Sequence, residues 1–472
     1  MVAPVLLAGC LENQGIPAAG YDFNIKFIKH FQNKSYWLML KQLMTMGQYG
    51  AVQLPRRAVI DVLRFTRRHL QIIKDRFQPD YMGLSVFTNE SIPFLHVMLY
   101  VLNRWFPDIK IVLGGRALEL EHMGMPWYQY LNQQGVADLI VVGDAESSLV
   151  TALRHKSTGI FQSPPQTKTD LDNIPLPRWD DYEMQDYQDF MSSPGLKKYF
   201  NVTGSKGCVR SCSFCDVASF WPKYIYRDGE KVAREMIENY RKTGINSFWF
   251  SDNLMNGSVS HYRRMNQILA AEIPREIRYG GYAIFRSKEH CRGQDFADMA
   301  QAGCYNWRIG VESGSQRVRN HMKKGFTDLD IEWTANQLHD HGISQTWLLI
   351  VGYPTETRED FELTKQLLTR YAAISKDRMI TLGITAGFML LKNSPLWQED
   401  RYHQELGWTN QHQRYWTVKD NPDNTFLERA DRWIELTQHS EELGYEWYDS
   451  STREKFKNEI EFLKQTYREQ HG

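Results

Sequence analysis

Three cysteines lie within eight residues of one another in the stretch GSKGCVRSCSFCDVASF, which begins at residue 204. They are Cys208, Cys212 and Cys215, and the rest of the chain holds only Cys10, Cys291 and Cys304. Thiols at such close spacing are typical of a metal or cluster site in a protein kept in a reducing compartment. The spacing therefore raises the question of what three sulfur ligands would hold.

Three explanations are compatible with this spacing. Structural zinc usually takes four ligands in two separated pairs, and here no second pair follows, since His261, the nearest downstream histidine, has no partner beside it. The cysteines can also be three unrelated buried thiols. Alternatively, they hold a 4Fe–4S cluster at three of its four irons. The fourth iron would then be an open coordination site, which in metal centres generally implies catalysis.

The composition of the 472-residue chain indicates a folded protein of more than one domain. Its 56 basic and 56 acidic side chains cancel, so the net charge gives no support for a nucleic-acid partner or an anionic membrane. The mean hydropathy is −0.52, and without a long apolar run no transmembrane helix is expected. The first residues lack the basic segment of a secretory signal, and the few cysteines do not suggest a disulfide scaffold. We therefore expect a cytoplasmic enzyme.

The elements that must position the cysteines are predicted to form two α/β series, of which residues 1–165 are the first. A helix is expected over residues 4–15 and a strand over residues 18–25, followed by apolar runs at 81–88, 109–115 and 138–144. Apolar strands that alternate with helices are typical of a parallel sheet covered on both faces, so we expect a doubly wound α/β domain. The proline-rich stretch that follows predicts a linker over residues 166–194.

The second series occupies residues 195–395. Its strand candidates are residues 198–205, 247–252, 277–285, 306–313, 344–352 and 384–391, with helical patterns such as 229–244 and 358–374 between them. This alternation predicts a partial (β/α)6 barrel of the TIM type, with its chemistry at the carboxyl ends of the strands. Residues 396–472 are expected to form a helical C-terminal subdomain, with surface helices over 424–444 and 451–470.

Polar residues stand where the predicted barrel strands end. Ser251 and Asp252 close the second strand, where they either face a ligand or cap the next helix. Arg286 follows the third strand and would pair with a ligand carboxylate, unless it is a plain surface arginine. Glu312 ends the fourth strand, where a carboxylate costs desolvation free energy unless it is paired. We therefore favour a functional role for Glu312 over that of a solvated acid at a helix start.

The cysteine spacing, with the aromatic Phe214 inside CSFC, resembles that of the radical S-adenosylmethionine (radical SAM) superfamily. Residues 307–325 are similar to the family's fourth-strand motif, in which an acid and a small hydroxyl residue approach S-adenosylmethionine, and Glu312 and Ser313 match those positions. Residues 347–361 resemble the fifth-strand motif, in which Gly352 would let the backbone approach the adenine. The resemblance covers residues 195–395 and implies a 4Fe–4S cluster on the three cysteines.

In that family, S-adenosylmethionine chelates the open iron through its amino and carboxylate groups. The reduced cluster passes one electron to the sulfonium, the C5′–S bond breaks, and the 5′-deoxyadenosyl radical abstracts a hydrogen atom. The cofactors carry this step, while the protein orients them and excludes water. The resemblance thus implies a reductant such as flavodoxin or ferredoxin, and a small-molecule substrate that the sequence does not identify.

The first 150 residues resemble the cobalamin-binding domains that often precede such barrels. In that fold a serine after one strand and a Gly-Gly after the next line the slot for the nucleotide tail of cobalamin, and Ser85, Gly114 and Gly115 match these positions. Tight turns are the alternative explanation for such residues. The sequence departs from the pattern in two ways, because a strand ahead of residue 4 is missing and so is the family's histidine loop, which ligates cobalt in some members.

The resemblance favours a cobalamin-dependent radical SAM methyltransferase that acts at an unreactive carbon. Ring formation or rearrangement with the same cofactors is the alternative within the class. Methylthiolation would need a second cysteine-ligated cluster in the front domain, where only Cys10 occurs. The competing class is non-catalytic, either an iron–sulfur electron carrier or a zinc-stabilised binding protein, and a fourth cysteine near the other three would have favoured it.

Overall fold

The computed structural model describes residues 2–46, 54–183, 185, 199–377, 379–385, 388–448 and 450–471. The chain divides into two compact units, Met1–Lys198 and Tyr199–Gly472. The barrel start predicted at residue 195, and nearly all of the predicted linker beyond residue 183, lie outside the described residues. Each unit has a parallel sheet of its own.

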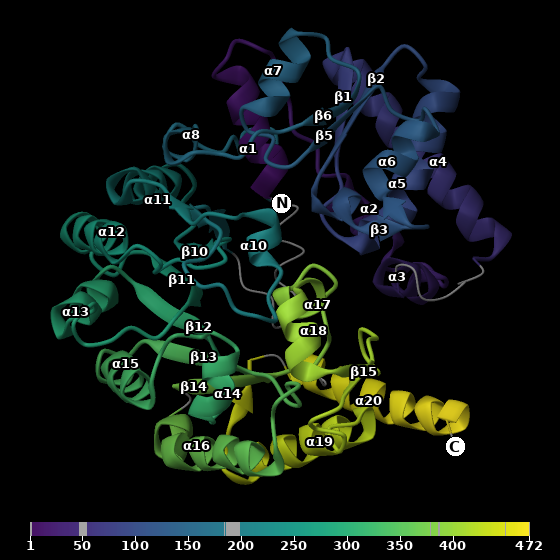
Figure 1. Ribbon diagram of the computed structural model, residues 1–472. Helices are drawn as coiled ribbons and strands as arrows, with labels where there is room; N and C mark the ends of the chain where they lie inside the picture. Colours follow the sequence, from purple (N-terminus) through teal and green to yellow (C-terminus); the bar gives the residue numbers. More distant parts are fainter. Residues whose placement is uncertain are drawn as a thin grey trace. The chain divides into compact units, whose positions relative to one another are not determined.

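The first unit is built on a four-stranded parallel sheet (Figure 1). Its strands lie side by side in the order β1 (Tyr81–Ser85), β2 (Lys110–Gly114), β5 (Leu139–Val142) and β6 (Gly159–Gln162). Every neighbouring pair is parallel. The first three strands confirm the predicted apolar runs, whereas β6 is not among the predicted strands because its four residues, GIFQ, give too short a pattern.

Helices cover both faces of this sheet, as the apolar runs predict. Ile111 and Leu113 of β2 belong to a core shared with α4 (Arg56–Phe77), α5 (Ile92–Trp105) and α6 (Trp127–Gln133). Val112, which lies between them, packs in a separate cluster with Ala152 of α7 (Ser148–Arg154). This alternation follows from the two-residue period of a strand.

The strand predicted over residues 18–25 is wrong. This segment leads into α2 (Phe23–Phe31), whose N-cap, Asp22, accepts hydrogen bonds from the amides of Asn24 and Ile25. A capping carboxylate satisfies amides that the first helical turn leaves without intrahelical partners, and this local gain outweighs a weak apolar alternation. The helix predicted at the start of the chain is confirmed as α1 (Val2–Glu12), and α3 (Trp37–Met46) follows α2. Within residues 2–46 and 54–80 the structure contains no strand.

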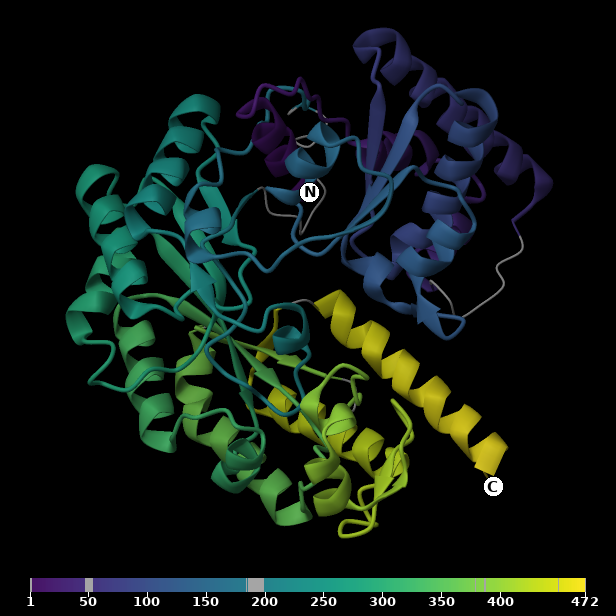
Figure 2. The same ribbon diagram turned by 45° about the horizontal axis from the view of Figure 1, so that its top comes forward.

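The second unit contains a parallel sheet enclosed by an arc of helices (Figure 2). Its order in the described residues is β17-β14-β13-β12-β11-β10-β7, and each neighbouring pair is parallel. The strands are β7 (Phe200–Val202), β10 (Ser247–Phe250), β11 (Arg278–Ala283), β12 (Cys304–Glu312), β13 (Ser344–Leu349), β14 (Ile380–Ile384) and β17 (Glu446–Trp447). The first five lie where the barrel strands are predicted, and the partial TIM-like barrel is confirmed.

The sixth barrel strand lies earlier in the chain than predicted. β14 spans Ile380–Ile384 rather than residues 384–391. Residues 386 and 387 of the predicted strand lie outside the described residues, while Phe388 is buried in a separate cluster with Tyr353 and Trp416. Apolar character alone does not distinguish a strand from a buried loop, which is why the prediction was displaced.

The helices that connect the strands lie on the outer side of the sheet (Figures 1 and 2). They are α11 (Gly229–Thr243), α12 (Val259–Glu272), α13 (Gly293–Gln301), α15 (Asp328–Asp340) and α16 (Arg358–Lys376). The first and last of these confirm the two predicted helices. The shorter elements of the chain are η1 (Asn89–Ser91), η2 (Arg116–Glu119), β3 (Glu121–His122), β4 (Met125–Pro126), α8 (Lys168–Asp172), β8 (Ser205–Lys206), α10 (Val217–Phe220), β9 (Ile225–Tyr226), α14 (Gln316–His321), α17 (Pro395–Gln398), α18 (Asp400–Leu406), β15 (Trp408–Asn410) and β16 (Thr417–Val418).

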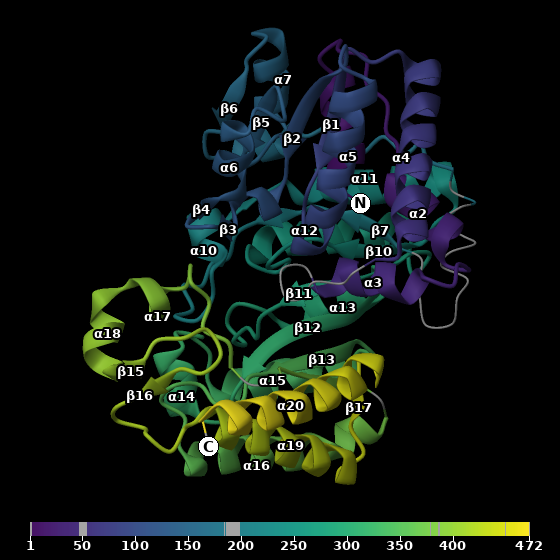
Figure 3. The ribbon, with the colours of Figure 1, turned by 90° about the vertical axis from the view of Figure 1, so that its right-hand side faces the viewer.

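The C-terminal region consists mainly of α19 (Phe426–Glu442) and α20 (Ser450–His471), which lie side by side (Figure 3). The prediction of a surface helix is wrong for α19, because Phe426 and Trp433 are buried and Trp433 Nε1 donates to the Ile384 carbonyl oxygen at 3.3 Å. β17, which stands between the two helices, pairs with β14 and so supplies the last strand of the sheet. None of the described helices is long and apolar enough to cross a membrane.

Candidate cluster and cofactor sites

The three cysteines lie on the loop between β8 and α10, beyond the carboxyl end of the first barrel strand. All three are half-buried and free of disulfides. The Arg210 amide donates to Cys208 Sγ at 3.4 Å, and the Cys215 amide donates to the Cys212 carbonyl oxygen at 3.1 Å. The loop is therefore a turned segment with partly accessible thiols, as a cluster-binding loop requires.

This cysteine loop packs against the segment that follows α14. The Ser213 amide donates to the Met322 carbonyl oxygen at 3.1 Å, and Cys212 Sγ lies 3.9 Å from the Lys323 carbonyl oxygen. The buried Ser213 hydroxyl is hydrogen-bonded to Tyr353 Oη at 2.8 Å, and Tyr353 Oη to His321 Nδ1 at 2.7 Å. The loops after β7, β12 and β13 are therefore tied together at one end of the barrel.

A buried ion pair lies beside the cysteine loop. Lys324 Nζ donates to Glu312 Oε1 at 2.9 Å, and both residues are less than a tenth exposed. Glu312 has a φ of 66°, a left-handed conformation that is uncommon for a residue other than glycine. Backbone strain of this kind concentrates at functional sites, and here it coincides with the acid that the sequence singles out.

The charge of Lys324 acts on the neighbouring thiols. Burial raises the pKa of Cys212 to about 11, and Lys324 opposes this rise. Burial also raises the pKa of Cys215, against a hydrogen bond from the Val217 amide. Burial alone would lower the pKa of Lys324, but Glu312 and Cys212 raise it. The ammonium group thus favours the thiolate forms that a cluster needs.

In the described part of the chain, no group of three or more His, Cys, Asp or Glu side chains is close enough to hold a single metal ion. The thiolates of an iron–sulfur cluster bind different iron atoms rather than one ion. The half-buried thiols, their loop and the buried ammonium group therefore fit a three-cysteine cluster by the chemistry of the donor set.

Phe214 lies within the cysteine loop and packs beside both the ion pair and the C-terminal region. Its ring lies 5.8 Å from Lys324 Nζ and makes an edge contact with Phe388, with 6.5 Å between the ring centroids. It therefore covers one side of the buried ammonium group.

Ser251 and Asp252 support the start of the cysteine loop. Asp252 is buried and accepts from the Gly204 amide at 2.8 Å and from Ser205 Oγ at 2.7 Å. The Ser251 hydroxyl is hydrogen-bonded to Thr203 Oγ1 at 2.9 Å. Burial is the main cause that raises the pKa of Asp252 to about 6. Both side chains thus form hydrogen bonds with residues 203–205, which follow the first barrel strand and lead to Cys208.

Replacement of Asp252 by asparagine should change the pH dependence of stability. The pKa of Asp252 rises from an ordinary 3.8 to about 6, so the folded state holds this proton more tightly than the unfolded state. The contribution of Asp252 to the free energy of unfolding is therefore largest below pH 4 and declines as the pH rises through 6. Asp252→Asn stays neutral and should remove a decline on the order of 2–3 kcal/mol. Urea unfolding of both proteins at several pH values measures this decline. If the free energies of unfolding of the two proteins change with pH in parallel, the raised pKa of Asp252 is contradicted.

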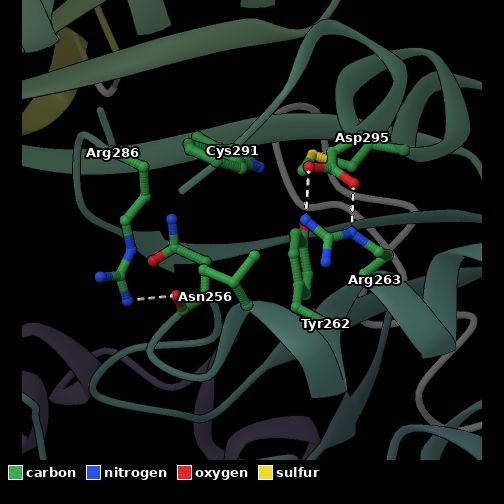
Figure 4. A pocket seen from close by; sticks show the side chains of 9 residues that line it. Asn256, Tyr262, Arg263, Arg286, Cys291 and Asp295 are labelled. Carbon is green, nitrogen blue, oxygen red and sulfur yellow. Dashed lines mark hydrogen bonds and ion pairs between the residues drawn. The ribbon is translucent and has the colours of Figure 1, made fainter. Parts of the chain in front are cut away.

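Arg286 reaches backbone oxygen atoms rather than open solvent (Figure 4). Its Nη2 donates to the carbonyl oxygens of Asn256 and Gly257 at 2.7 and 2.6 Å. It lines a small pocket together with Trp307 and the ion pair between Arg263 and Asp295, which Figure 4 also shows. Burial lowers the pKa of Arg286. In this structure Arg286 stabilises the loop after β10.

Ser313 and Gly352 lie at the ends of β12 and β13, but neither faces open space. Ser313 is fully buried, and its hydroxyl accepts from the Ser315 amide at 3.1 Å. Gly352 has a φ of 79°, and a Cβ atom there would lie 2.3 Å from the side chain of Arg429. The glycine is therefore required by its conformation and by the close approach of α19.

Several residues around the site are missed by sequence reasoning. Lys324 pairs with Glu312, while Asn424, Arg429 and Arg432 reach from the C-terminal region to the loop after β13. Asn424 Nδ2 donates to the Tyr353 carbonyl oxygen at 2.9 Å, and Arg432 Nη1 lies 3.2 Å from Glu356 Oε1. Only Lys324 carries a sequence signal, since it lies inside the stretch that resembles the fourth-strand motif.

In the first unit, the predicted cobalamin residues meet at the carboxyl ends of β1 and β2. Ser85 and Gly114 are register partners, and Ser85 is exposed. Gly115 follows with φ 115° and ψ 153°, a region that is essentially confined to glycine. The structure thus brings these three residues together at one sheet edge, where ligands of open α/β sheets bind.

The substitution Gly115→Ala should strongly destabilise the first unit. A Cβ atom there would lie 2.4 Å from the Val86 carbonyl oxygen, in addition to the backbone strain, so we expect a loss of at least about 3 kcal/mol. Gly15→Ala is the matched control, because Gly15 also has a positive φ, 73°, but faces open space. We expect it to cost about 1–2 kcal/mol. Urea unfolding compares the two, and equal losses would refute the packing argument.

Comparison with known proteins agrees with this arrangement. Residues 202–368 match the family model of the Radical SAM superfamily. The chain is 23% identical over 393 residues to cytidylyl-2-hydroxyethylphosphonate methyltransferase of Streptomyces wedmorensis, covering 73% of this chain and 71% of that protein. It is 26% identical over 312 residues to the anaerobic magnesium-protoporphyrin IX monomethyl ester cyclase of Rubrivivax gelatinosus, covering 61% of this chain and 54% of that protein.

A solved structure extends the likeness to nearly the whole chain. The radical S-adenosylmethionine methyltransferase TsrM from Kitasatospora setae, solved with cobalamin and a 4Fe–4S cluster bound, has a TM-score of 0.59 at 13% identity. The match covers 93% of this chain and 86% of that one, so the two proteins share a fold. The family match contains the cysteine loop, the ion pair and the loop after β13. The chain is therefore an enzyme whose residues 202–368 match the Radical SAM superfamily.

Proposed function

We propose that the chain is a cobalamin-dependent radical SAM methyltransferase that acts at an unreactive carbon of a small molecule. The observation that carries the proposal is the loop of three half-buried thiols beside the buried pair of Lys324 and Glu312, inside the matched family segment. The names of the Streptomyces protein and of TsrM favour methyl transfer over other outcomes.

When bound, a 4Fe–4S cluster with S-adenosylmethionine supplies one-electron cleavage of the sulfonium, and cobalamin supplies the methyl group. We assign Cys208, Cys212 and Cys215 as the cluster ligands. The Lys324 ammonium, held by Glu312, offsets the negative charge that these thiolates bring into a buried place. Phe214 and the packed loops around it keep water from that side of the site.

The ligand contacts rest on the family resemblance and on the places where the strands end. By the resemblance we assign Glu312 to the S-adenosylmethionine site, together with the strand ends at Ser313 and Gly352, whose side-chain positions face protein in this structure. Ser251, Asp252 and Arg286 would position the loops around it through their bonds to the backbone and to neighbouring side chains.

The first unit would bind cobalamin at the carboxyl ends of its strands. Ser85, Gly114 and Gly115 would line the slot for the nucleotide tail, where small residues let the tail lie against the backbone. A one-electron reductant such as flavodoxin or ferredoxin would reduce the cluster. We further propose that residues 1–165 form the cobalamin domain, 195–395 the barrel and 396–472 a helical subdomain, which also gives β17 to the barrel sheet.

A second candidate is a cyclase or rearrangement enzyme that uses the same cofactors. The likeness to the Rubrivivax cyclase, at 26% identity, favours it. The two candidates share every residue assigned above and differ in what becomes of the substrate.

The methyl-transfer proposal can be tested without knowing the substrate. The chain is reconstituted anaerobically with iron, sulfide and hydroxocobalamin, then reduced and mixed with S-adenosylmethionine. We expect methylcobalamin in the absorption spectrum and an equal amount of S-adenosylhomocysteine by chromatography. Cluster and corrin bands without methylcobalamin favour the second candidate, and the absence of both bands contradicts both candidates.

Matched variants test whether cobalamin binds where we propose. Ser85→Tyr places a ring at the exposed carboxyl end of β1 and should lower the amount of retained cobalamin several-fold. Thr158→Tyr is the control, because Thr158 is exposed and precedes β6, at the amino end of that strand. If both variants retain cobalamin equally, the proposed slot is wrong.

A further inference from the structure

Arg308 lies in the middle of the barrel sheet, and no described residue is an anionic partner for it. It belongs to β12, and its Cζ lies 4.4 Å from the ring centroid of Trp249, 4.9 Å from that of Tyr448 and 6.0 Å from that of Tyr282. Among the described residues no carboxylate forms an ion pair with it, and its buried Nε has no hydrogen-bond partner. A guanidinium group is thus enclosed by three aromatic rings.

These contacts place Arg308 on the inner face of the curved sheet. Its neighbour Trp307 is fully buried and contacts Tyr262 of α12, so Trp307 faces the outer helices. Side chains alternate along a strand, which turns Arg308 the other way. Trp249 of β10 and Tyr448, next to β17, come from opposite sides of β12 in the sheet order, and both reach Arg308 across the inner face.

Two glycines make room for the rings that enclose Arg308. A Cβ atom on Gly280 of β11 would lie 2.9 Å from the ring of Trp249, and one on Gly383 of β14 would lie 2.8 Å from the ring of Tyr448. Both rings can therefore lie close against the sheet. The sequence thus provides space for the aromatic enclosure on both sides of the arginine.

The inner face around Arg308 carries polar side chains and is partly exposed. Its register partner on β13 is Thr346, which is hydrogen-bonded to Thr381 of β14 at 3.1 Å. Tyr282 and Tyr448 are 39% and 44% exposed, so two of the three rings around Arg308 are in part exposed to solvent. The interior of a TIM barrel is usually filled by layers of bulky branched side chains. A polar, accessible interior with a central cation is instead suited to a charged ligand.

The buried arginines of this unit have partners of a kind that the described residues do not give to half-buried Arg308. Arg227 and Arg432 pair with the carboxylates of Glu235 and Glu356, and Arg429 donates to backbone carbonyl oxygens. Aromatic rings stack on the face of a guanidinium group and leave the N–H donors at its edge available. That edge matches the two oxygens of a carboxylate or a phosphorus oxyanion.

We propose that Arg308 binds an oxyanion group of the substrate, either a carboxylate or a phosphate or phosphonate, inside the barrel. This inference adds a substrate class to the proposed function. It rests on that function for the statement that the bound molecule is the substrate. Arg308 precedes Glu312 by four residues on the same strand, which corresponds to about 13 Å. The anchored molecule would therefore extend from Arg308 toward the end of the barrel that carries the cysteine loop.

The test uses chemical modification of arginine on the purified full-length chain. Phenylglyoxal is added alone or with methylphosphonate, acetate or uncharged acetamide, and the modified peptides are quantified by mass spectrometry. We expect methylphosphonate or acetate to slow the modification of Arg308 several-fold, and acetamide to leave it unchanged. Arg278 is the internal control, because it is exposed on the neighbouring strand and stacks on Tyr305 at 4.8 Å. Its modification should not change.

Thermal unfolding supplies a second measurement. We expect the effective anion to raise the Tm of the wild-type chain and of Arg278→Gln but not of Arg308→Gln, with a smaller rise for Arg308→Lys. The proposal is overturned if phenylglyoxal does not reach Arg308, if neither anion slows its modification, or if Arg278 is protected equally. Neither measurement requires the cluster or cobalamin, so failure here leaves the methyl-transfer proposal standing. Failure to form methylcobalamin would likewise leave the anion site intact.

Discussion

Cys212→Ala is expected to abolish the reductive cleavage of S-adenosylmethionine to 5′-deoxyadenosine. With one of the three proposed ligands removed, a cluster would lose a thiolate that neither Cys291 nor Cys304 can replace, because both are buried elsewhere in the barrel. The variant should stay soluble, since Cys212 is only half-buried and the loop keeps the hydrogen bonds of Ser213. Iron content and 5′-deoxyadenosine, measured after anaerobic reconstitution and reduction, report the outcome.

Cys291→Ala is the matched control for this experiment. It removes a thiol from the same unit, but from a place beside the pocket between α12 and α13 rather than from the cysteine loop. We expect it to keep about four irons per chain and the cleavage activity of the wild-type chain. A Cys212→Ala protein with full activity would exclude the ligand assignment.

Arg432→Met is expected to lower the free energy of unfolding by about 3–5 kcal/mol, because it leaves the carboxylate of Glu356 buried and unpaired. Both side chains of this pair are almost fully buried, and Glu356 also accepts the Gly352 amide at 2.9 Å. Urea unfolding followed by tryptophan fluorescence measures the loss. The double variant Arg432→Met/Glu356→Gln should recover most of it, since a neutral amide can still accept the Gly352 bond.

The size of this loss should depend on pH. Burial already raises the pKa of Glu356 from 4.5 to about 7, although Arg432 opposes the rise. The folded state therefore holds this proton more tightly than the unfolded state, and stability falls as the pH increases from 4.5 through 7. Without Arg432 the pKa of Glu356 rises further. The difference in the free energy of unfolding between the variant and the wild type should therefore be small near pH 5 and large near pH 8. A loss that is the same at both pH values would show that packing, not charge, dominates.

The sequence was most informative where a function confines several residue types to a short stretch. The cysteine loop, Glu312 and the apolar strands from β7 to β13 follow from local pattern, and the structure places the acid beside the loop. That Ser85 and Gly114 lie side by side could also be predicted, because neighbouring parallel strands end at the same side of a sheet.

Other features could not be predicted because they depend on contacts between distant parts of the chain. Arg429 and Arg432 look like surface charges on an amphipathic helix, yet both are buried against the loop after β13. The sequence leaves open whether Asp252 faces a ligand or caps a helix, and whether Arg286 pairs with a ligand or lies at the surface. In the structure both side chains bind the backbone of neighbouring loops. A pattern of residue types locates a strand end, while only tertiary packing decides which way a polar side chain turns there.

The late position of β17 has a consequence for the synthesis of this protein on the ribosome. β14 ends at Ile384 and its partner begins at Glu446, so about 60 residues must be translated between them. At the usual rate of about 5–20 residues per second, the edge of β14 stays unpaired for several seconds. An unpaired edge can recruit strands of other chains, so the nascent polypeptide is most prone to aggregation in this interval. Slow codons in this stretch would lengthen the interval and should lower the soluble yield.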